Sequence, residues 1–180
     1  FGTQYRSEIF YIDEMQKMMA EGCEKILIFP MYPQYSATTT ASVIDRVYEF
    51  LRKTRWQPTV RVVPPYYDDS IYIDALKKHV EILERKKKIK FEKIICSFHG
   101  IPKKYFFKGD PYHCQCAKTV RLLNEKYKKK QKFEMSFQSR FGPQEWLRPY
   151  MNEKMDELIK VNKRNLVIMA PGFSVDCLET

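Results

Sequence analysis

Several features that mark common protein classes are missing from this sequence. No GxGxxG or GxxxxGKS/T pattern follows any predicted strand, which excludes the usual phosphate-binding loops. No apolar stretch approaches the roughly 20 residues needed to span a bilayer, and the sequence shows no secretory signal. The five cysteines are odd in number and contain no CxxC pair. We therefore expect a reduced, intracellular, soluble protein without a disulfide framework.

Internal repeats and low-complexity linkers are also absent, whereas apolar side chains are plentiful. Hydrophobic residues make up 44% and aromatic residues 14% of the 180 positions, which is enough for a substantial core. This length suits one domain, or one domain with part of another. Because the chain begins at Phe1 rather than Met and stops at Thr180, where a helix is predicted to begin, we expect a piece of a longer protein.

The charge balance is basic, with 32 Lys and Arg against 22 Asp and Glu and a formal net charge of +10. A basic face could serve nucleic acid, an anionic membrane surface or an anionic small molecule. However, the lysine-rich runs at residues 85–88 and 128–130 each close a predicted helix, where cations complement the helix dipole and are commonly just solvated. We therefore expect no nucleic-acid partner.

Helix and strand patterns alternate along the chain. The predicted strands cover residues 25–30, 59–63, 93–98, 133–137 and 166–170. The predicted helices cover residues 7–21, 38–53, 68–88, 114–129 and 149–161, with a long loop at 99–113. Such alternation predicts a doubly wound α/β fold with mostly parallel strands. We place a boundary between a leading piece, residues 1–45, which would be the remnant of an N-terminal domain, and a second domain, residues 46–180.

Two of the predicted strands run into glycine and proline close to a group that can take up protons or hold a metal. His99 follows the strand at 93–98, and Glu179 lies shortly beyond the strand at 166–170. Ligand sites in open α/β sheets form at the carboxyl ends of strands, and an imidazole and a carboxylate there suit proton transfer or metal handling. Taken alone, each has an ordinary alternative: a hydrogen-bonded loop histidine, and an acidic residue in the first turn of a helix.

Aromatic residues gather around the predicted strand ends. They are Tyr32, Tyr35, Phe98, Tyr105, Phe141, Trp146 and Phe173. Such rings can simply seal the top of a sheet, but their concentration favours the walls of a pocket for a flat apolar ligand. Cys114 and Cys116 form the only close pair of cysteines. An iron–sulfur cluster there would need further thiolates from elsewhere in the fold, so free structural cysteines are favoured.

Five motifs in this order resemble the ferrochelatase family. They are YPQYS at 32–36 with TTT at 38–40, SFHGIP at 97–102, GDPY at 109–112, FQSRFGP at 137–143 with Trp146–Leu147, and PGF at 171–173 with DCLET at 176–180. Any one of these motifs would be weak, whereas five in family order are specific. The resemblance extends over residues 25–180.

The resemblance implies a lyase-class chelatase that inserts ferrous iron into a porphyrin, protoporphyrin IX or coproporphyrin III, in haem biosynthesis. It implies two similar α/β domains flanking a cleft, iron as substrate and no required cofactor. By position, His99 and Glu179 become the catalytic and metal-binding pair on opposite faces of the macrocycle. The positions assigned to porphyrin binding are Tyr32, Trp146, Phe173 and Asp176. A cytoplasmic location is implied, while peripheral membrane contact and the oligomeric state stay open.

The chemistry of metal insertion asks for the same residue types. Two pyrrole protons must leave as the dication enters, and a neutral imidazole with a pKa of ~6.5 can accept one of them. A carboxylate on the other face can hold iron or relay protons, and the porphyrin propionates need cations such as Arg6, Arg140 or Arg148. Two alternatives stay open: a related tetrapyrrole chelatase for another metal, and a non-catalytic basic module that binds an anionic ligand.

Overall fold

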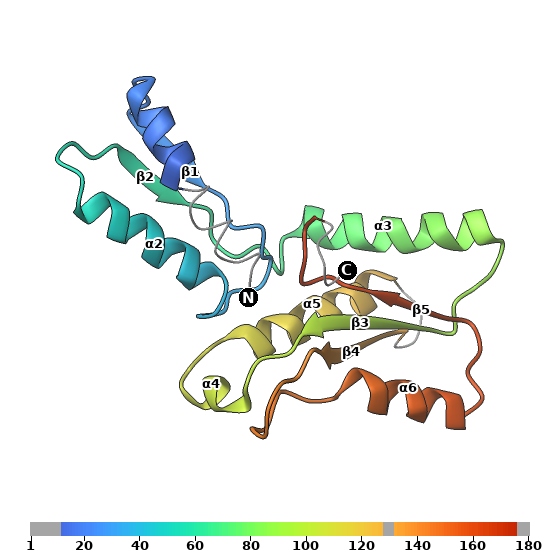
Figure 1. The fold of residues 1–180 in the computed structure, drawn as a ribbon. Coiled ribbons are helices and arrows are strands. Elements are labelled where there is room, and N and C mark those ends of the chain that lie inside the picture. The colour runs from blue at the N-terminus through green and yellow to red at the C-terminus, as the bar shows by residue number, and fades with distance from the viewer. Residues whose placement is uncertain (1–11, 128–131, 176–180) are drawn as a thin grey trace. The chain divides into compact units, whose positions relative to one another are not determined.

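The computed structural model describes residues 12–127 and 132–175 (Figure 1). These residues form two compact units. The described part of the first comprises residues 12–31 and 36–64, and that of the second comprises residues 32–35, 65–127 and 132–175. The domain boundary predicted between residues 45 and 46 lies inside helix α2 (Thr40–Arg52) and stays a prediction.

The first unit is built on two parallel strands, β1 (Lys25–Ile28) and β2 (Thr59–Val62), joined through α2. A helix covers residues 12–20 ahead of β1. The helices and the sheet share one small core, whose fully buried members are Met15, Ile26, Val47 and Leu51. Because α2 supplies two of these side chains, it packs with the first unit along its whole length, and the units divide after Pro64.

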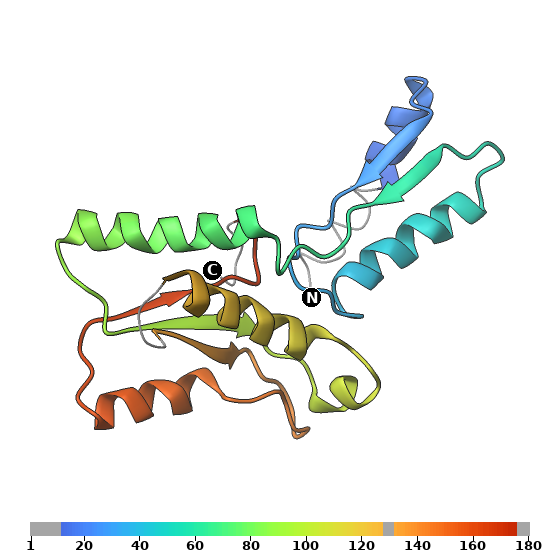
Figure 2. The same cartoon turned by 180° about the vertical axis from the view of Figure 1, so that it is seen from behind.

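The second unit holds a three-stranded parallel sheet in the order β4-β3-β5. Its strands are β3 (Lys93–His99), β4 (Phe133–Gln138) and β5 (Leu166–Met169). Its helices are α3 (Ser70–Lys87), α4 (Lys103–Phe107), α5 (Tyr112–Tyr127) and α6 (Met151–Lys160). Figures 1 and 2 show α3 and α6 on opposite faces of this sheet. Parallel strands covered by helices confirm the predicted α/β class.

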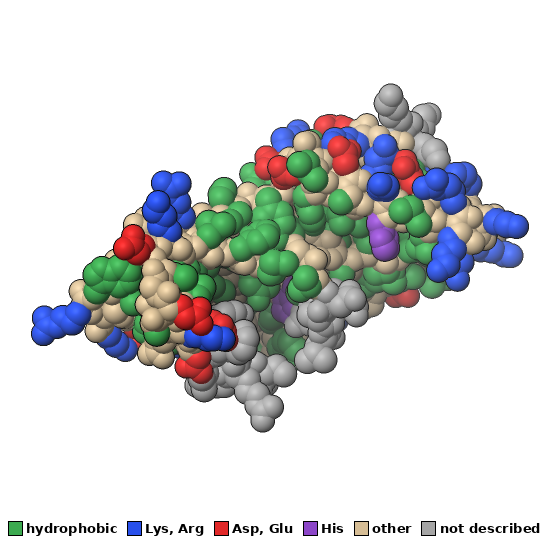
Figure 3. Space-filling model, turned by 90° about the horizontal axis from the view of Figure 1, so that it is seen from above, with side chains coloured by type: hydrophobic (Ala, Val, Ile, Leu, Met, Phe, Trp, Pro, Cys, Tyr) green, Lys and Arg blue, Asp and Glu red, His purple; other side chains and the backbone are tan. Residues whose placement is uncertain are grey.

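The sheet core is apolar because β3 is the central strand. Residues 94–98 of β3 are all buried, and Phe98 packs against Phe137 of β4 with ring centroids 6.2 Å apart. Basic side chains stay outside: Figure 3 shows Lys and Arg gathered around the last turn of α3, which contains Arg85, Lys86 and Lys87. None of the described helices is both long and apolar enough to cross a membrane.

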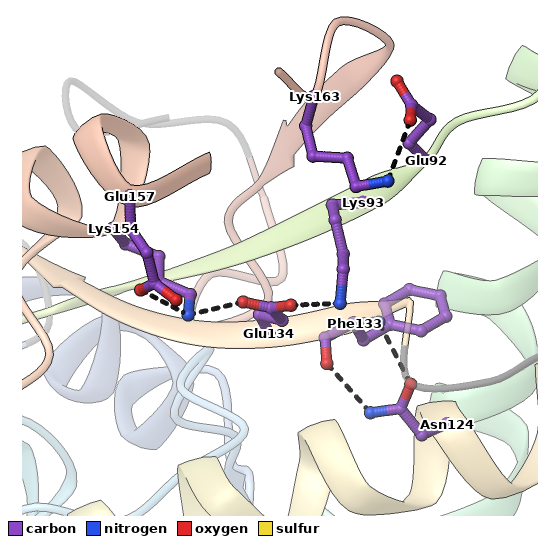
Figure 4. Close-up of polar contacts among 8 residues, drawn as sticks. All are labelled: Glu92, Lys93, Asn124, Phe133, Glu134, Lys154, Glu157 and Lys163. Atoms are coloured by element: carbon purple, nitrogen blue, oxygen red, sulfur yellow. Dashed lines mark hydrogen bonds and ion pairs between the residues drawn. The ribbon is translucent and has the colours of Figure 1, made fainter. Parts of the chain in front are cut away.

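The amino-terminal ends of the strands are held by ion pairs (Figure 4). Glu134 at the start of β4 pairs with Lys93 of β3 and with Lys154 of α6, the latter at 2.6 Å. Next to it, Lys163 before β5 pairs with Glu92 before β3 at 3.1 Å. We call Lys93, Glu134 and Lys154 the Glu134 clamp. This clamp ties β3, β4 and α6 at the end of the sheet that lies away from His99.

Candidate functional site

The carboxyl ends of β3 and β4 stop side by side. His99, the last residue of β3, is in register with Gln138, the last residue of β4. The N–H of Gly100 continues this pairing and donates to the carbonyl of Gln138 at 2.7 Å. Because the strands are parallel, the loops that follow β3, β4 and β5 all leave from this edge. It is therefore the place where an α/β sheet builds a ligand site.

His99 is half-buried, and its ring is fixed by a neighbouring carbonyl. Its Nδ1 lies 2.7 Å from the carbonyl oxygen of Gly100. In the neutral ring this contact places the proton on Nδ1, because a carbonyl can only accept, and Nε2 becomes the basic nitrogen. The geometry thus gives His99 a defined tautomer and one atom that can accept a proton or bind a metal.

Trp146 is brought to this edge by a short antiparallel pairing between the loops after β3 and β4. The N–H of Leu147 donates to the carbonyl of Ile101 at 3.0 Å, and the N–H of Lys103 donates to that of Glu145 at 2.9 Å. The indole is 8% exposed, and its Nε1 donates to the carbonyl of Phe141 at 2.9 Å. This polar anchor fixes the ring plane.

Gly100 is the residue that lets the indole come so close to the sheet. A Cβ at this position would lie 2.9 Å from the carbonyl oxygen of Gln138 and 3.3 Å from Cε3 of Trp146. The first distance is shorter than real Cβ contacts, and the atom it meets is backbone. Glycine is therefore required here for close approach rather than for a turn.

A hollow of about 390 Å³ opens beside these residues. Its walls include Gly100, Gln138, Trp146 and Tyr150, and Arg140 lies at its rim. The Arg140 guanidinium lies 4.5 Å from the Tyr150 ring centroid, within cation–π range. The hollow therefore combines an aromatic wall with a cation, which suits a flat apolar ligand that carries an anionic group.

The segment at residues 32–35 also belongs to this unit, although residues on both sides of it pack with the first unit. Gln34 is 1% exposed, and its Nε2 donates to the Thr119 hydroxyl at 3.1 Å and to the carbonyl of Pro171 at 3.3 Å. The N–H of Tyr35 donates to Oε1 of Gln115 at 2.6 Å. The segment is therefore tied both to α5 and to the turn after β5.

The hydrogen bonds of Gln34 connect the two loops that contain Tyr32 and Phe173, which are also predicted site residues. Tyr32 lies two residues before Gln34, and Phe173 lies two residues after Pro171; both are half-buried. The N–H of Phe173 donates to the carbonyl of Ala170 at 3.2 Å, which closes the turn that presents its ring. Gln34 itself was not predicted as a site residue. The only signal for it is a polar amide inside the aromatic YPQYS motif.

The predicted partners Asp176 and Glu179 lie outside the described residues, so the pairing of Glu179 with His99 stays a prediction. Among residues 12–127 and 132–175, no three or more His, Cys, Asp or Glu side chains form a group that could hold a metal. On α5, Cys114 is exposed and Cys116 is buried. Burial raises the pKa of the Cys116 thiol, so this side chain is a protonated core residue.

Burial also shifts the pKa values of two other ionisable groups, Tyr72 and His113. Burial raises the pKa of Tyr72, whose hydroxyl donates to the carbonyl of Pro171, so this donor stays protonated. Burial lowers the pKa of His113, whose ring stacks on Phe137 with centroids 5.8 Å apart. A neutral His113 is consistent with this aromatic packing rather than with a charged role.

Comparison with known proteins matches residues 4–180 to the family described as Ferrochelatase. The chain is 51% identical over 174 residues to the ferrochelatase of Rhizobium meliloti, covering 94% of the chain and 49% of that protein. It is 52% identical over 167 residues to that of Allorhizobium ampelinum, covering 92% and 48%. With the ferrochelatase of Francisella tularensis subsp. holarctica it shares 49% over 170 residues, covering 93% and 51%. The chain spans about half the length of these relatives.

Proposed function

The chain belongs to the ferrochelatase family, and on this premise we propose that the whole protein inserts ferrous iron into a porphyrin during haem biosynthesis. The observation that carries the proposal is the His99 ring, which a hydrogen bond fixes at the carboxyl end of β3. The enzyme would be a lyase-class chelatase with iron as substrate. Protoporphyrin IX and coproporphyrin III are the two candidate acceptors.

His99 acts as the acceptor for a pyrrole proton. With Nδ1 donating to the Gly100 carbonyl, Nε2 carries the lone pair. Once Nε2 is protonated, the ring is an imidazolium that the same carbonyl stabilises through the Nδ1–H bond. The neutral ring, with its lone pair on Nε2, is the form that can take up this proton. The second proton and the handling of iron are assigned to Glu179 on the opposite face of the macrocycle.

The porphyrin is held by aromatic walls and one cation. Trp146 offers a ring fixed by its Nε1 bond, and Tyr32 and Phe173 come from loops connected through Gln34. Asp176 is assigned to the same pocket from the family pattern. Binding a bent macrocycle against rigid walls turns the pyrrole lone pairs out of plane, at a strain of roughly 1–5 kcal/mol supplied by the remote contacts.

Of the three arginines considered for a propionate contact, Arg6 lies outside the described residues, and Arg140 is a better candidate than Arg148. It is exposed at the rim of the hollow, and it makes no ion pair with an acidic residue in the described part of the chain. Arg148 instead binds both carboxylate oxygens of Glu153, at 3.0 and 2.7 Å, and is therefore already neutralised. This contrast favours Arg140 over Arg148 as the partner of an anionic substrate group.

The proposal is tested by anaerobic iron insertion with the full-length protein, followed by loss of porphyrin fluorescence. We expect His99→Ala to lower kcat by roughly 10²–10⁴-fold, the usual contribution of a general base. The matched control is His79→Ala, because His79 lies exposed on α3. Unchanged turnover in His99→Ala would overturn the assignment of His99.

The same assay separates the alternatives that the sequence leaves open. Efficient insertion of cobalt or zinc without iron insertion would identify a chelatase for another metal. A non-catalytic basic module would bind its ligand equally well after His99→Ala and lose it when the charges of the lysine runs are reversed. Parallel assays with protoporphyrin IX and coproporphyrin III identify the preferred acceptor. The cytoplasmic location stays a prediction, and the oligomeric state stays open.

A further inference from the structure

The turn that follows β5 is held by side chains from other parts of the second unit. Pro171 and Gly172 are buried, and the N–H of Phe173 donates to the carbonyl of Ala170 at 3.2 Å. This backbone bond closes the turn, but the place of the turn on the molecule depends on bonds to other elements. Figures 1 and 2 show the chain beyond β5 passing beside the first turn of α3, which supplies such partners.

Two tyrosines, one just before α3 and one in its first turn, bind the turn through their hydroxyl groups. The hydroxyl of Tyr72 donates to the carbonyl of Pro171. The hydroxyl of Tyr66 lies 2.5 Å from Oγ of Ser174, within hydrogen-bond distance. We call Tyr66 and Tyr72 the tyrosine pair. The pair therefore holds the chain on both sides of Phe173.

The tyrosine pair is itself firmly placed. The Asp69 carboxylate caps the first turn of α3, because it accepts hydrogen bonds from the N–H groups of Ile71 and Tyr72 at 2.8 and 3.1 Å. Tyr72 packs against the main core, and its ring meets that of Tyr66 edge-on with centroids 5.6 Å apart. Burial raises the pKa of Tyr72, so its hydroxyl stays a donor at the pH of an enzyme assay. The pair is therefore a rigid support for the turn.

We propose that the tyrosine pair positions the Phe173 ring for porphyrin binding, with Tyr72 as the larger contributor. Phe173 lies between Pro171 and Ser174, the two residues that the pair holds, so the pair determines where its ring lies. A wall that is already fixed in the free protein costs less ordering entropy when the ligand binds. Both tyrosines are positioning residues that act through Phe173. The inference rests on the proposed function only in assigning Phe173 to the porphyrin.

The test is porphyrin binding to the full-length protein, measured by fluorescence quenching, together with the kinetics of iron insertion. Tyr72→Phe keeps the ring in the core and removes only the hydroxyl. We expect its porphyrin Kd and KM to rise about three- to tenfold, the usual worth of one hydrogen bond, with a smaller change in kcat. Tyr66→Phe should have a weaker effect, because its partner Ser174 is exposed. Ser174→Ala should match Tyr66→Phe, since both variants remove the same bond.

A double-mutant cycle separates positioning from a general loss of stability. Because Tyr72 acts through Phe173, Tyr72→Phe should change the porphyrin Kd by less than about twofold once Phe173 is replaced by alanine. A merely structural role would give the same factor in both backgrounds. The matched control is Tyr127→Phe, which removes the hydroxyl of a buried tyrosine at the end of α5, where the ring packs edge-on against Phe133. Its porphyrin Kd and KM should equal those of wild type.

The outcomes distinguish this inference from the proposed function. An unchanged Kd in Tyr72→Phe, an equal factor in the Phe173→Ala background, or an equal loss in Tyr127→Phe would overturn the role of the tyrosine pair. A wild-type protein that binds porphyrin but inserts no iron contradicts the proposed function alone, because the binding cycle still measures the coupling of Tyr72 to Phe173. A protein that inserts iron with a KM that Tyr72→Phe leaves unchanged contradicts the tyrosine pair alone.

Discussion

At the scale of single residues, the candidate site depends on close packing around Gly100. This residue supplies the carbonyl that orients His99, an N–H that extends the pairing of β3 with β4, and the space that Trp146 fills. Gly100 therefore affects both the orientation of the His99 ring and the position of the Trp146 ring. A side chain at this position would disturb both at once.

Gly100→Ala tests this link. The added Cβ would meet the Gln138 carbonyl at 2.9 Å, and because that atom is backbone the strand end must shift. We expect a loss of about 1–3 kcal/mol in unfolding free energy, typical of overpacking, and weaker porphyrin binding through displaced Trp146. Urea unfolding and fluorescence quenching by porphyrin measure the two effects.

Gly172→Ala is the matched control in the same unit. A Cβ there would meet Phe98, Tyr112 and Gln34 at 3.5–3.8 Å, which is ordinary van der Waals contact. We expect the unfolding free energy to change by less than about 1 kcal/mol. Equal effects of the two substitutions would contradict the specific role of Gly100.

At the scale of elements, sequence patterns located most strands and helices but misplaced their ends. Residues 99–113 were expected to be a loop, and α4 lies within it. Five residues carry no helical periodicity that a pattern can detect. Helix α5 begins at Tyr112, two residues before its predicted start, because the Asp110 carboxylate accepts a hydrogen bond from the Tyr112 N–H at 3.0 Å.

The candidate site was also predictable only in part, because sequence patterns show local features and not contacts between distant residues. The place of His99 at a strand end could be predicted because a buried strand followed by glycine and proline is a local pattern, while its role stays a prediction. Gln34 was missed because its partners Thr119 and Pro171 lie 85 and 137 residues away in sequence. A buried amide whose hydrogen bonds span such separations leaves no local signal. The assignments of Tyr32, Trp146 and Phe173 stay predictions, and their loop positions are what the structure adds.

The Glu134 clamp predicts how stability depends on pH. Burial alone would raise the pKa of Glu134, but the hydrogen bonds and charges of Lys154 and Lys93 outweigh burial and lower it. A carboxyl with a lowered folded-state pKa stabilises the fold above its unfolded pKa of about 4.3, and this contribution is lost as pH falls through the folded value. Backbone N–H groups of Arg164 and Asn165 likewise lower the pKa of Glu92 to about 2.

Glu134→Gln should therefore destabilise the protein by about 1.5–3 kcal/mol near neutral pH, the usual worth of hydrogen bonds to a charged group. The gap between wild type and variant should shrink below about pH 4, because the wild-type carboxylate is then protonated as well. Urea unfolding across this pH range measures both. Glu157→Gln, which removes an exposed partner of Lys154, should change little. A gap that is constant with pH would refute the clamp.

At the scale of the whole molecule, the two ends of the three-stranded sheet differ in what they contain. The amino-terminal end carries the Glu134 clamp, and the carboxyl-terminal end carries His99, the hollow and the loops tied by Gln34. Moreover, the four residues 32–35 pack with the second unit between two stretches that pack with the first. A substitution at residue 34 should therefore destabilise segments of the second unit that are far from residue 34 in sequence.

Gln34→Ala tests this consequence. Removing the amide leaves the Pro171 carbonyl without its Gln34 partner and takes one hydrogen bond from the Thr119 hydroxyl, which should cost about 1–3 kcal/mol. Hydrogen exchange should show faster exchange in α5 and at residues 170–173, with β1 and β2 unchanged. The control Gln57→Ala removes a 2.6 Å bond to the Leu51 carbonyl, so its effect should stay within the first unit. Faster exchange near β1 and β2 in Gln34→Ala, with α5 unaffected, would show that residues 32–35 do not stabilise the second unit.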